Sequence, residues 1–304
     1  MAYPATEVTA LPRSHADLLE RPISIALTTE MPDGRLQSTV VWFSFDRGDV
    51  LVNTMREFQK ARNLRDRPRA TVLVREPPGE RWIELRTSVT LEERGAREHL
   101  DALALAYTGV ERYFGGAVPL ELAAREHPVI CRLHPVRICT GPAFFHGGQR
   151  DATTTAPPAH EPRGCDEDIS IPDSHYDLLE RPLLAAVSTR LRPGAQTHPT
   201  WFEVDRNDVL INTTLERAKG RNLLRDSRAT VLVVDPQNDG RWIEIRGDVE
   251  LQRAGAEEHL DRLTQRYTQH AHYYGNVYPL EQRGHETRVI ARIHPRRINC
   301  DAIH

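Results

Sequence analysis

The side chains best suited to chemistry form a short basic string that occurs twice in the chain. Its polar members are Lys60, Arg62 and Asn63 in the first occurrence, and Lys219, Arg221 and Asn222 in the second. Lysine acts as a point charge and arginine as a bidentate fork, and the N–H groups at a helix start also favour anions. We therefore interpret each string as an anion clamp. A solvated basic helix is the alternative, but repetition of the whole string favours function.

A predicted strand that ends in Asn-Thr precedes each basic string. The pairs are Asn53-Thr54 and Asn212-Thr213. The amide and hydroxyl groups of these residues can donate and accept hydrogen bonds to an incoming polar group. We therefore expect each pair to contribute to the same site as the basic string that follows it.

These matches belong to a repeat that covers most of the chain. Leu-Glu-Arg-Pro occurs at residues 19–22 and 179–182, and Arg-Trp-Ile-Glu at 81–84 and 241–244. The offset of about 160 residues far exceeds a solenoid repeat, so the chain contains a duplicated domain. The length of 304 residues also suits two domains. We predict a first copy at residues 1–140, a linker rich in Gly, Pro and Thr at 141–173, and a second copy at 174–304.

Each copy has the pattern of six short strands with two or three helices. In the first copy the expected strands lie within residues 23–29, 40–43, 50–52, 70–74, 82–86 and 129–133. Trp82 and Glu84 alternate with Ile83 and Leu85, the period of a half-buried strand. The strands do not alternate with long helices, which excludes a doubly wound parallel sheet. The pattern predicts a mainly β (α+β) fold, an antiparallel barrel with appended helices in each copy.

The composition narrows the possible partners and compartments. The formal net charge is -3, so no overall field attracts nucleic acid. No apolar run reaches the length of a membrane span, and the first ten residues lack signal-peptide features. The four cysteines form no CxxC pair, which argues against a zinc site or a disulfide framework. We expect a cytoplasmic protein with no membrane or nucleic-acid partner.

Several further residues are weaker candidates. His134 and His294 repeat before a proline at the end of the last strand, and His270 and His272 have the spacing of two metal ligands on a strand. Structural roles are the favoured interpretation for all four. Tyr113, Tyr273, Tyr274 and Tyr278 could cover a planar ring or pack between the copies, and Trp82 and Trp242 are expected in the core or between the copies. The chain has no Gly-x-Gly-x-x-Gly or P-loop string.

The ordered set of motifs resembles the pyridoxamine-phosphate-oxidase-like split-barrel superfamily. The order is Leu-x-x-Pro, Trp-Phe, Asn-Thr, Lys-x-Arg-Asn-Leu and Arg-x-x-Ile-Glu-x-Arg, and it is present in both copies. It is most similar to the branch of oxidoreductases that use the deazaflavin F420 or FMN. Members of this superfamily are typically dimers of six-stranded split barrels. The resemblance therefore implies two tandem six-stranded antiparallel split β-barrels that form a pseudo-dimer within one chain, possible as a monomer.

The resemblance also implies a cofactor site between the copies. The clamp for the phosphate and tail maps onto Lys60, Arg62, Asn63, Lys219, Arg221 and Asn222, with Asn53, Thr54, Asn212 and Thr213 near the ring edge, and Trp42, Pro199 and Trp201 on the strands that back the ring. The first copy has Thr39-Val40 where the second has His198-Pro199, and the family favours that proline. One or both of the two sites could therefore be functional, and the second copy fits better.

The implied function is hydride transfer from reduced F420, or alternatively FMN, to a C=C or C=N bond of a small or medium organic acceptor. In such an enzyme the cofactor carries the reaction and the protein orients it. One alternative is a non-catalytic carrier of flavin, deazaflavin or haem. A second alternative is a structural pair of barrels without any cofactor.

Overall fold

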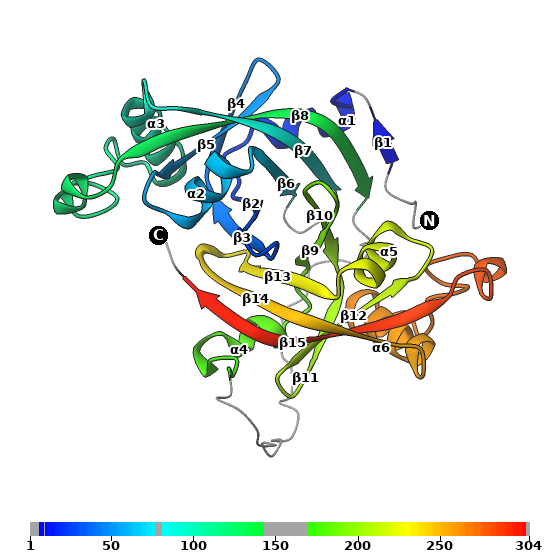
Figure 1. The fold of residues 1–304 in the computed structure, drawn as a ribbon. Helices are drawn as coiled ribbons and strands as arrows, with labels where there is room; N and C mark the ends of the chain where they lie inside the picture. The colour runs from blue at the N-terminus through cyan, green and yellow to red at the C-terminus, as the bar shows by residue number, and fades with distance from the viewer. Residues whose placement is uncertain (1–5, 9, 77–80, 143–168, 302–304) are drawn as a thin grey trace.

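The chain folds into two antiparallel sheets, one from each copy of the repeat (Figure 1). The computed structural model describes residues 6–8, 10–76, 81–142 and 169–301. Within this part of the chain, no helix combines the length and apolar character needed to cross a bilayer.

The two copies have the same order of elements. The first copy contains β1 (Thr6–Val8), α1 (Arg13–Ala16), η1 (Asp17–Leu19), β2 (Ile25–Glu30), β3 (Leu36–Val41), β4 (Phe43–Asp46), β5 (Asp49–Met55), α2 (Gln59–Asp66), β6 (Arg69–Arg75), β7 (Arg81–Glu92), α3 (Ala96–Thr108), η2 (Leu120–Ala124) and β8 (Pro128–Pro142). The second copy contains α4 (Asp173–Glu180), β9 (Ala185–Arg190), β10 (Ala195–Thr200), β11 (Phe202–Asp205), β12 (Asp208–Thr214), α5 (Ala218–Arg225), β13 (Arg228–Asp235), β14 (Asn238–Gln252), α6 (Ala256–Thr268), η3 (Leu280–Gln282) and β15 (Arg288–Cys300).

The sheets have equivalent topologies. The first runs β3-β2-β6-β7-β8-β5-β4, and the second runs β10-β9-β13-β14-β15-β12-β11. The short strand β1 pairs with β8 and, among the described residues, has no counterpart in the second sheet. The predicted mainly β, tandem antiparallel fold is confirmed.

Each sheet has seven repeated strands where six were expected. The extra strand arises at Trp42, where one predicted strand divides in two: β3 pairs with β2, whereas β4 pairs with β5. The same division occurs at Trp201 between β10 and β11. The apolar string around each tryptophan gives no sign in the sequence that the chain changes neighbours there.

Each copy has its own core. Because side chains along a strand alternate between the two faces of the sheet, one face covers this core and the other lies at the contact between the copies. Ile83 and Leu85 of β7 are fully buried among the apolar residues of the first copy. Trp82 lies in a different cluster that also contains Trp201 and Trp242 of the second copy. Of the two positions expected for Trp82 and Trp242, the core or the contact between the copies, the structure shows the second, and both faces of β7 are buried.

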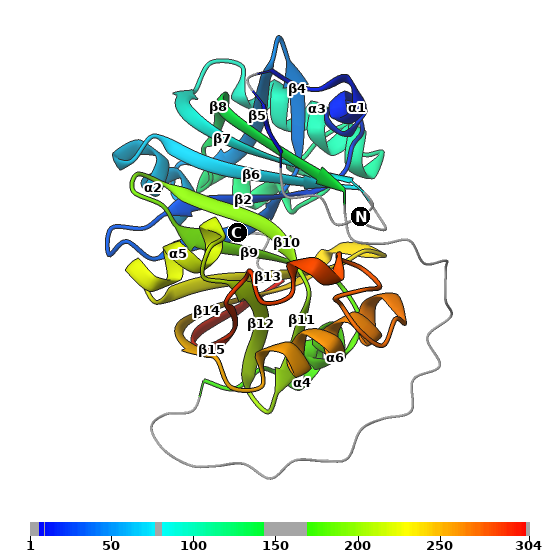
Figure 2. The same cartoon turned by 90° about the vertical axis from the view of Figure 1, so that its right-hand side faces the viewer.

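The copies dock through the outer faces of their sheets. In Figure 2 one copy lies above the other; β10 contacts β2, β6 and β7 of the first copy, and β3 contacts β9, β13 and β14 of the second. Four fully buried hydroxyl groups form the centre of this contact: the Thr28 Oγ1 lies 2.8 Å from Ser38 Oγ and 3.0 Å from Ser188 Oγ, and Ser188 Oγ lies 2.9 Å from Thr197 Oγ1. Thr28 is the repeat counterpart of Ser188, and Ser38 that of Thr197, so the cluster marks a pseudo-two-fold axis.

The division into two copies and a linker stays a prediction. Strand β8 continues to Pro142 and helix α4 begins at Asp173, close to the proposed limits. Most of the proposed linker, residues 143–168, lies outside the described residues.

Candidate functional site

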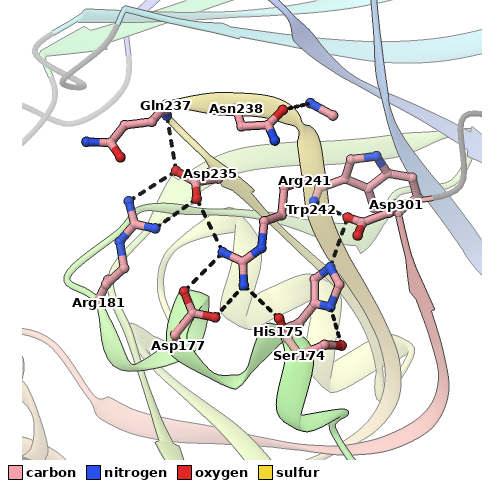
Figure 3. A network of polar contacts seen from close by, with 11 residues as sticks. Ser174, His175, Asp177, Arg181, Asp235, Gln237, Asn238, Arg241, Trp242 and Asp301 are labelled. Atoms are coloured by element: carbon pink, nitrogen blue, oxygen red, sulfur yellow. Dashed lines mark hydrogen bonds and ion pairs between the residues drawn. The ribbon is translucent and has the colours of Figure 1, made fainter.

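The most strongly repeated strings of the sequence form an ion-pair network that supports the fold. In Figure 3 the Arg241 guanidinium lies between the carboxylates of Asp177 and Asp235, at 3.0 and 3.3 Å, and Arg181 holds the other side of Asp235. In the first copy, Arg81 bonds Asp17 in the same way. Each network joins the Leu-Glu-Arg-Pro turn to the hairpin that carries Arg-Trp-Ile-Glu. The repetition of these strings is therefore explained by folding.

The two lysines of the basic strings are buried on helices at equivalent positions. Lys60 on α2 is 8% exposed, and Lys219 on α5 is half-buried, where its ammonium donates a hydrogen bond to Thr200 Oγ1. Burial lowers the pKa of Lys60 to about 8 and the pKa of Lys219 to about 7. Among the described residues neither lysine forms an ion pair with a carboxylate. A buried cation without a carboxylate is costly unless an anion joins it.

The environments of these lysines differ in charge. Desolvation is the main cause that lowers the pKa of Lys60. Cys131 and Glu244 of the other copy act in the opposite direction and favour the charged form. The pKa of Lys219 is lowered further by the neighbouring guanidinium of Arg217. Lys219 therefore lies in the more positive environment.

The arginines of the basic strings do not share a face with the lysines. Arg62 and Arg221 are exposed, and Arg221 donates to the backbone oxygen of Glu216. Residues two apart on a helix point in nearly opposite directions. The structure thus does not bring each Lys-x-Arg pair together as a fork around one anion.

The asparagines of the basic strings attach their helices to the sheets. Asn63 is buried and its Nδ2 donates to Thr29 Oγ1 at 3.0 Å and to Gln37 Oε1 at 3.2 Å. Asn222 donates to the corresponding groups, Thr189 and Gln196. These bonds occupy both amide hydrogens, so the asparagines position the helices that carry the lysines.

The Asn-Thr pairs lie beside the third α-helix of each copy, α3 or α6. Asn53 Nδ2 donates to the backbone oxygen of Ala96 at 2.7 Å, and Asn212 donates to that of Ala256 at 2.7 Å. Thr54 and Thr213 are buried. The Oδ1 atoms of both asparagines are buried and accept no hydrogen bond among the described residues. Their amide groups fix the starts of α3 and α6.

The tryptophans that follow β3 and β10 stack on tyrosines. Trp42 stacks on Tyr107 and Trp201 on Tyr267, with ring centroids 5.3 Å apart in both cases. Tyr273 meets Trp201 edge-on at 6.4 Å. Pro199 is half-buried on β10, opposite Ala186. Trp201 and Tyr273 therefore form an aromatic pair on the second copy, and Trp201 directly follows Thr200, the hydrogen-bond partner of Lys219.

Two glutamates link the copies and were not selected from the sequence. Glu84 Oε1 accepts the backbone N–H of Thr197, and Glu244 Oε1 accepts that of Ser38, both at 2.6 Å. Burial would raise the pKa of Glu84, but His198 Nε2, 3.5 Å away, and other donors hold it below its ordinary value. The Ile-Glu string, repeated in both copies, was the feature of the sequence that could have identified these two glutamates.

Arg217, which acts on the charge of Lys219, belongs to a polar group that the sequence analysis missed. Arg217 and Arg288 both bond Glu286, and Arg288 also bonds the hydroxyl of Tyr274 at 2.9 Å. The predicted loop tyrosines Tyr273 and Tyr274 lie in the apolar cluster shared by the two copies. Comparison of the copies at residue 217, where the first has Phe58, could have revealed this set.

The histidine candidates have structural partners. His134 Nδ1 lies 2.9 Å from Asp49, and His294 Nδ1 lies 2.9 Å from Asp208. His272 is exposed and lies 2.8 Å from Asp261. In the part of the chain that the structure describes, no group of three His, Cys, Asp or Glu side chains could hold a metal ion.

A recess of about 350 Å³, open to solvent, lies at another part of the junction between the copies. It is lined by the β2–β3 hairpin and by β13 and β14, and it contains none of the predicted site residues. Its arginines are neutralised; Arg190, for example, pairs with Glu30 at 2.7 Å. The Lys60 and Lys219 regions remain the better candidates for an anion because their charges are not neutralised by carboxylates.

Comparison with known proteins identifies the family. The sequence model described as pyridoxamine 5'-phosphate oxidase matches residues 11–131 and 171–300. The chain belongs to this family. The two matched segments correspond to the two copies, so this is a tandem member of the pyridoxamine 5'-phosphate oxidase family. No curated protein matches the chain.

Several solved structures resemble one copy of this family member. They include an F420 reductase (26% identical, covering 42% of this chain and 98% of that chain, TM-score 0.37). Another is a conserved hypothetical protein from Mycobacterium tuberculosis (21% identical, 48% and 96% covered, TM-score 0.37). A third is PhzG from Burkholderia lata 383 in complex with tetrahydrophenazine-1-carboxylic acid (20% identical, 43% and 74% covered, TM-score 0.32).

Proposed function

We propose that this member of the pyridoxamine 5'-phosphate oxidase family is an oxidoreductase that binds F420, or alternatively FMN, between its two copies. Its substrate is a small or medium organic acceptor with a reducible C=C or C=N bond. The chain supplies both halves of the pseudo-dimer, so a monomer suffices, and we propose that it acts in the cytoplasm. F420 is our first candidate because the strings Lys-x-Arg-Asn-Leu and Ile-Glu-x-Arg-Gly of the second copy resemble that branch.

The observation that carries this proposal is the pair of buried, equivalent lysines without a carboxylate partner. Lys60 and Lys219 lie where a phosphate or carboxylate would restore electroneutrality. Both F420 and FMN have such groups beside a planar ring system. The aromatic pair of Trp201 and Tyr273 adjoins Thr200, the hydrogen-bond partner of Lys219, and we propose that it packs near the flat part of the same ligand.

The residues of the chain have separate tasks in this proposal. A bound deazaflavin or flavin would supply the hydride. Lys219 and Lys60 bind the anionic tail, and Asn222 and Asn63 hold the helices that present these lysines. The dense packing around Trp201 excludes water from one face of the ligand.

A thermal shift screen against FMN, F420 and haem tests the proposal. A ligand at 100 times its Kd adds about 2.7 kcal/mol of stability, which raises Tm by roughly 5–10 °C for a domain of this size. We expect F420 or FMN to give this shift, followed by oxidation of the reduced cofactor with an activated alkene. The exposed Arg221 provides the control: Lys219→Met should abolish most of the shift, and Arg221→Ala should retain it.

The alternatives give different results in the same screen. A carrier protein would bind flavin, deazaflavin or haem without turnover of any acceptor. A structural pair of barrels would show no shift with any of the three compounds, and that outcome would refute the proposal.

A further inference from the structure

A serine, a histidine and an aspartate form a continuous chain of polar contacts at the start of α4 (Figure 3). Ser174 Oγ lies 2.9 Å from His175 Nδ1, and His175 Nε2 lies 2.9 Å from Asp301 Oδ1. Asp301 directly follows β15, so the fold brings together residues that are far apart in the sequence. A hydroxyl, an imidazole and a carboxylate joined in this order are the groups of a Ser-His-Asp triad, which is recognised by its geometry and not by sequence position.

Burial differs along this chain of contacts in the way that nucleophilic catalysis requires. The His175 ring is 5% exposed and is held by packing, whereas Ser174 is exposed and accessible to a ligand. When His175 carries its N–H on Nε2, towards Asp301, the lone pair of the imidazole lies on Nδ1, towards the Ser174 hydroxyl. His175 can therefore accept the proton of that hydroxyl.

Asp301 is fixed in position and stays ionised. Its Oδ1 accepts the backbone N–H of Trp242 at 2.8 Å, and its own N–H donates to the Trp242 carbonyl oxygen. Burial would raise the pKa of Asp301, but the His175 side chain and the Trp242 N–H hold it below its ordinary value. The φ of Asp301 is 46°, in the left-handed region that is costly for residues other than glycine. The fold thus maintains a strained backbone at the residue that orients the imidazole.

The first turn of α4 is also fixed, and it presents backbone N–H groups. Arg241 Nη2 donates to the Ser174 carbonyl oxygen at 2.7 Å, and Asp177 holds the same guanidinium. The first N–H groups of a helix have no acceptor within the helix, and the helix dipole favours negative charge there. The N–H groups of Asp173 and Ser174 can therefore stabilise the oxyanion that forms when the Ser174 hydroxyl adds to a carbonyl group.

The first copy has the serine and the histidine but not the acid at the equivalent position. Ser14 Oγ lies 2.9 Å from His15 Nδ1, so this pair has a role at the start of both copies. The residue that corresponds to Asp301 is Gly141, where a Cβ would lie 2.7 Å from the Trp82 ring. The acid is thus an addition of the second copy, and the Ser14 pair is a control within the same chain.

We propose that Ser174, His175 and Asp301 form a hydrolytic site for small, reactive carboxylic esters. The Ser174 hydroxyl adds to the ester carbonyl while His175 takes its proton; the proton passes to the alcohol that leaves, and the acyl group stays on Ser174 Oγ. Water then adds to the acyl group and gives a proton to His175. The carboxylic acid leaves as that proton returns to Ser174. The site needs neither F420 nor FMN, so it is independent of the proposed function.

Hydrolysis of p-nitrophenyl acetate by the full-length protein tests the proposal, together with fluorophosphonate labelling and mass spectrometry of the labelled peptide. We expect hydrolysis above the buffer rate and a single label on Ser174. Ser174→Ala should remove the label and lower the rate at least about tenfold, and Asp301→Asn should lower the rate by a similar factor. Ser14→Ala, the matched control, should change neither the rate nor the label.

The outcomes are distinct from those of the cofactor screen. A label on another residue, or no label, would overturn the proposal. An unchanged rate in Ser174→Ala would do the same, because it would assign the hydrolysis to other side chains. The label in the unsubstituted protein needs no variant, so the proposal stays testable if circular dichroism shows that a variant does not fold. Thermal shifts with FMN and F420 should be the same in Ser174→Ala as in the unsubstituted protein.

Discussion

Substitution of Glu244 by glutamine should destabilise the second copy at the surface where it meets the first. Glu244 is 1% exposed, and its Oε1 accepts the backbone N–H of Ser38 from the other copy at 2.6 Å. Its Oε2 accepts hydrogen bonds from Arg246 at 2.7 Å and from Asn299 at 2.6 Å. Glutamine can retain the bond to Ser38, but its amide then points an NH₂ group at two donors.

The expected loss follows from these contacts. Hydrogen bonds to a charged group contribute about 1.5–3 kcal/mol each, and removing one partner of a buried ion pair costs about 3–5 kcal/mol. Because two such bonds are lost, we expect Glu244→Gln to lower the free energy of unfolding by about 3–5 kcal/mol. With a urea m-value of about 3 kcal/mol/M, the midpoint should fall by about 1 M or more.

Urea denaturation followed by circular dichroism measures this loss. Glu250 lies on the same strand with a side chain that is 60% exposed, so Glu250→Gln is the matched control and should change stability by less than about 0.5 kcal/mol. An unfolding midpoint for Glu244→Gln within the range of that control would refute the role of Glu244 Oε2 as the buried acceptor for Arg246 and Asn299.

Three further predictions concern the second copy. A Cβ at Gly220 would lie 2.0 Å from the Thr214 carbonyl oxygen. Gly220→Ala should therefore lower the free energy of unfolding in urea by about 1–3 kcal/mol and weaken phosphate binding. The control Ala61→Gly, at the equivalent position of the first copy, should leave phosphate binding unchanged. Because the pKa of Lys219 is about 7 and sulfate stays doubly charged across this range, sulfate affinity measured by calorimetry should fall as pH rises from 6 to 8, and a flat profile would contradict this. Burial lowers the pKa of His259 to about 4, so the neutral histidine contributes fully to stability above its unfolded-state pKa of about 6.5. As pH falls toward 4, the free energy of unfolding should therefore decrease by about 2–3 kcal/mol. His259→Gln should reduce this pH dependence, measured by urea unfolding at each pH.

The repeat in the sequence was sufficient to predict the architecture. Alternation at Trp82, Ile83 and Glu84 identified the strand but predicted it to be half-buried, whereas the second face is buried by the other copy. The division of a strand at Trp42 was not predictable, since it depends on which neighbour the backbone pairs with after a bend. Register between strands is set by long-range contacts that a local pattern does not contain.

The sequence located the site region but not the role of each residue. The lysines of the basic strings are buried cations, as a ligand site requires, whereas Asn63 and Asn222 fasten their helices to the sheet. Lys60 and Arg62 lie two residues apart on a helix, so their side chains point to different faces. Their spacing in the sequence was sufficient to predict this difference. Arg217 and Arg288 are distant in sequence and come together because β12 pairs with β15, where Thr214 lies opposite Arg288, so no motif joins them.

The hydroxyl groups where the two sheets meet have a consequence for the origin of the chain. A side chain on a two-fold axis faces the same side chain of the other subunit, so it must be able to form a hydrogen bond with a group identical to itself. Hydroxyl groups can do this because each one both donates and accepts, whereas two carboxylates or two ammonium groups would repel each other. Thr28 and Ser188 still obey that requirement although the covalent link no longer imposes it. Either half of the protein thus retains the chemistry to pair with a second copy of itself.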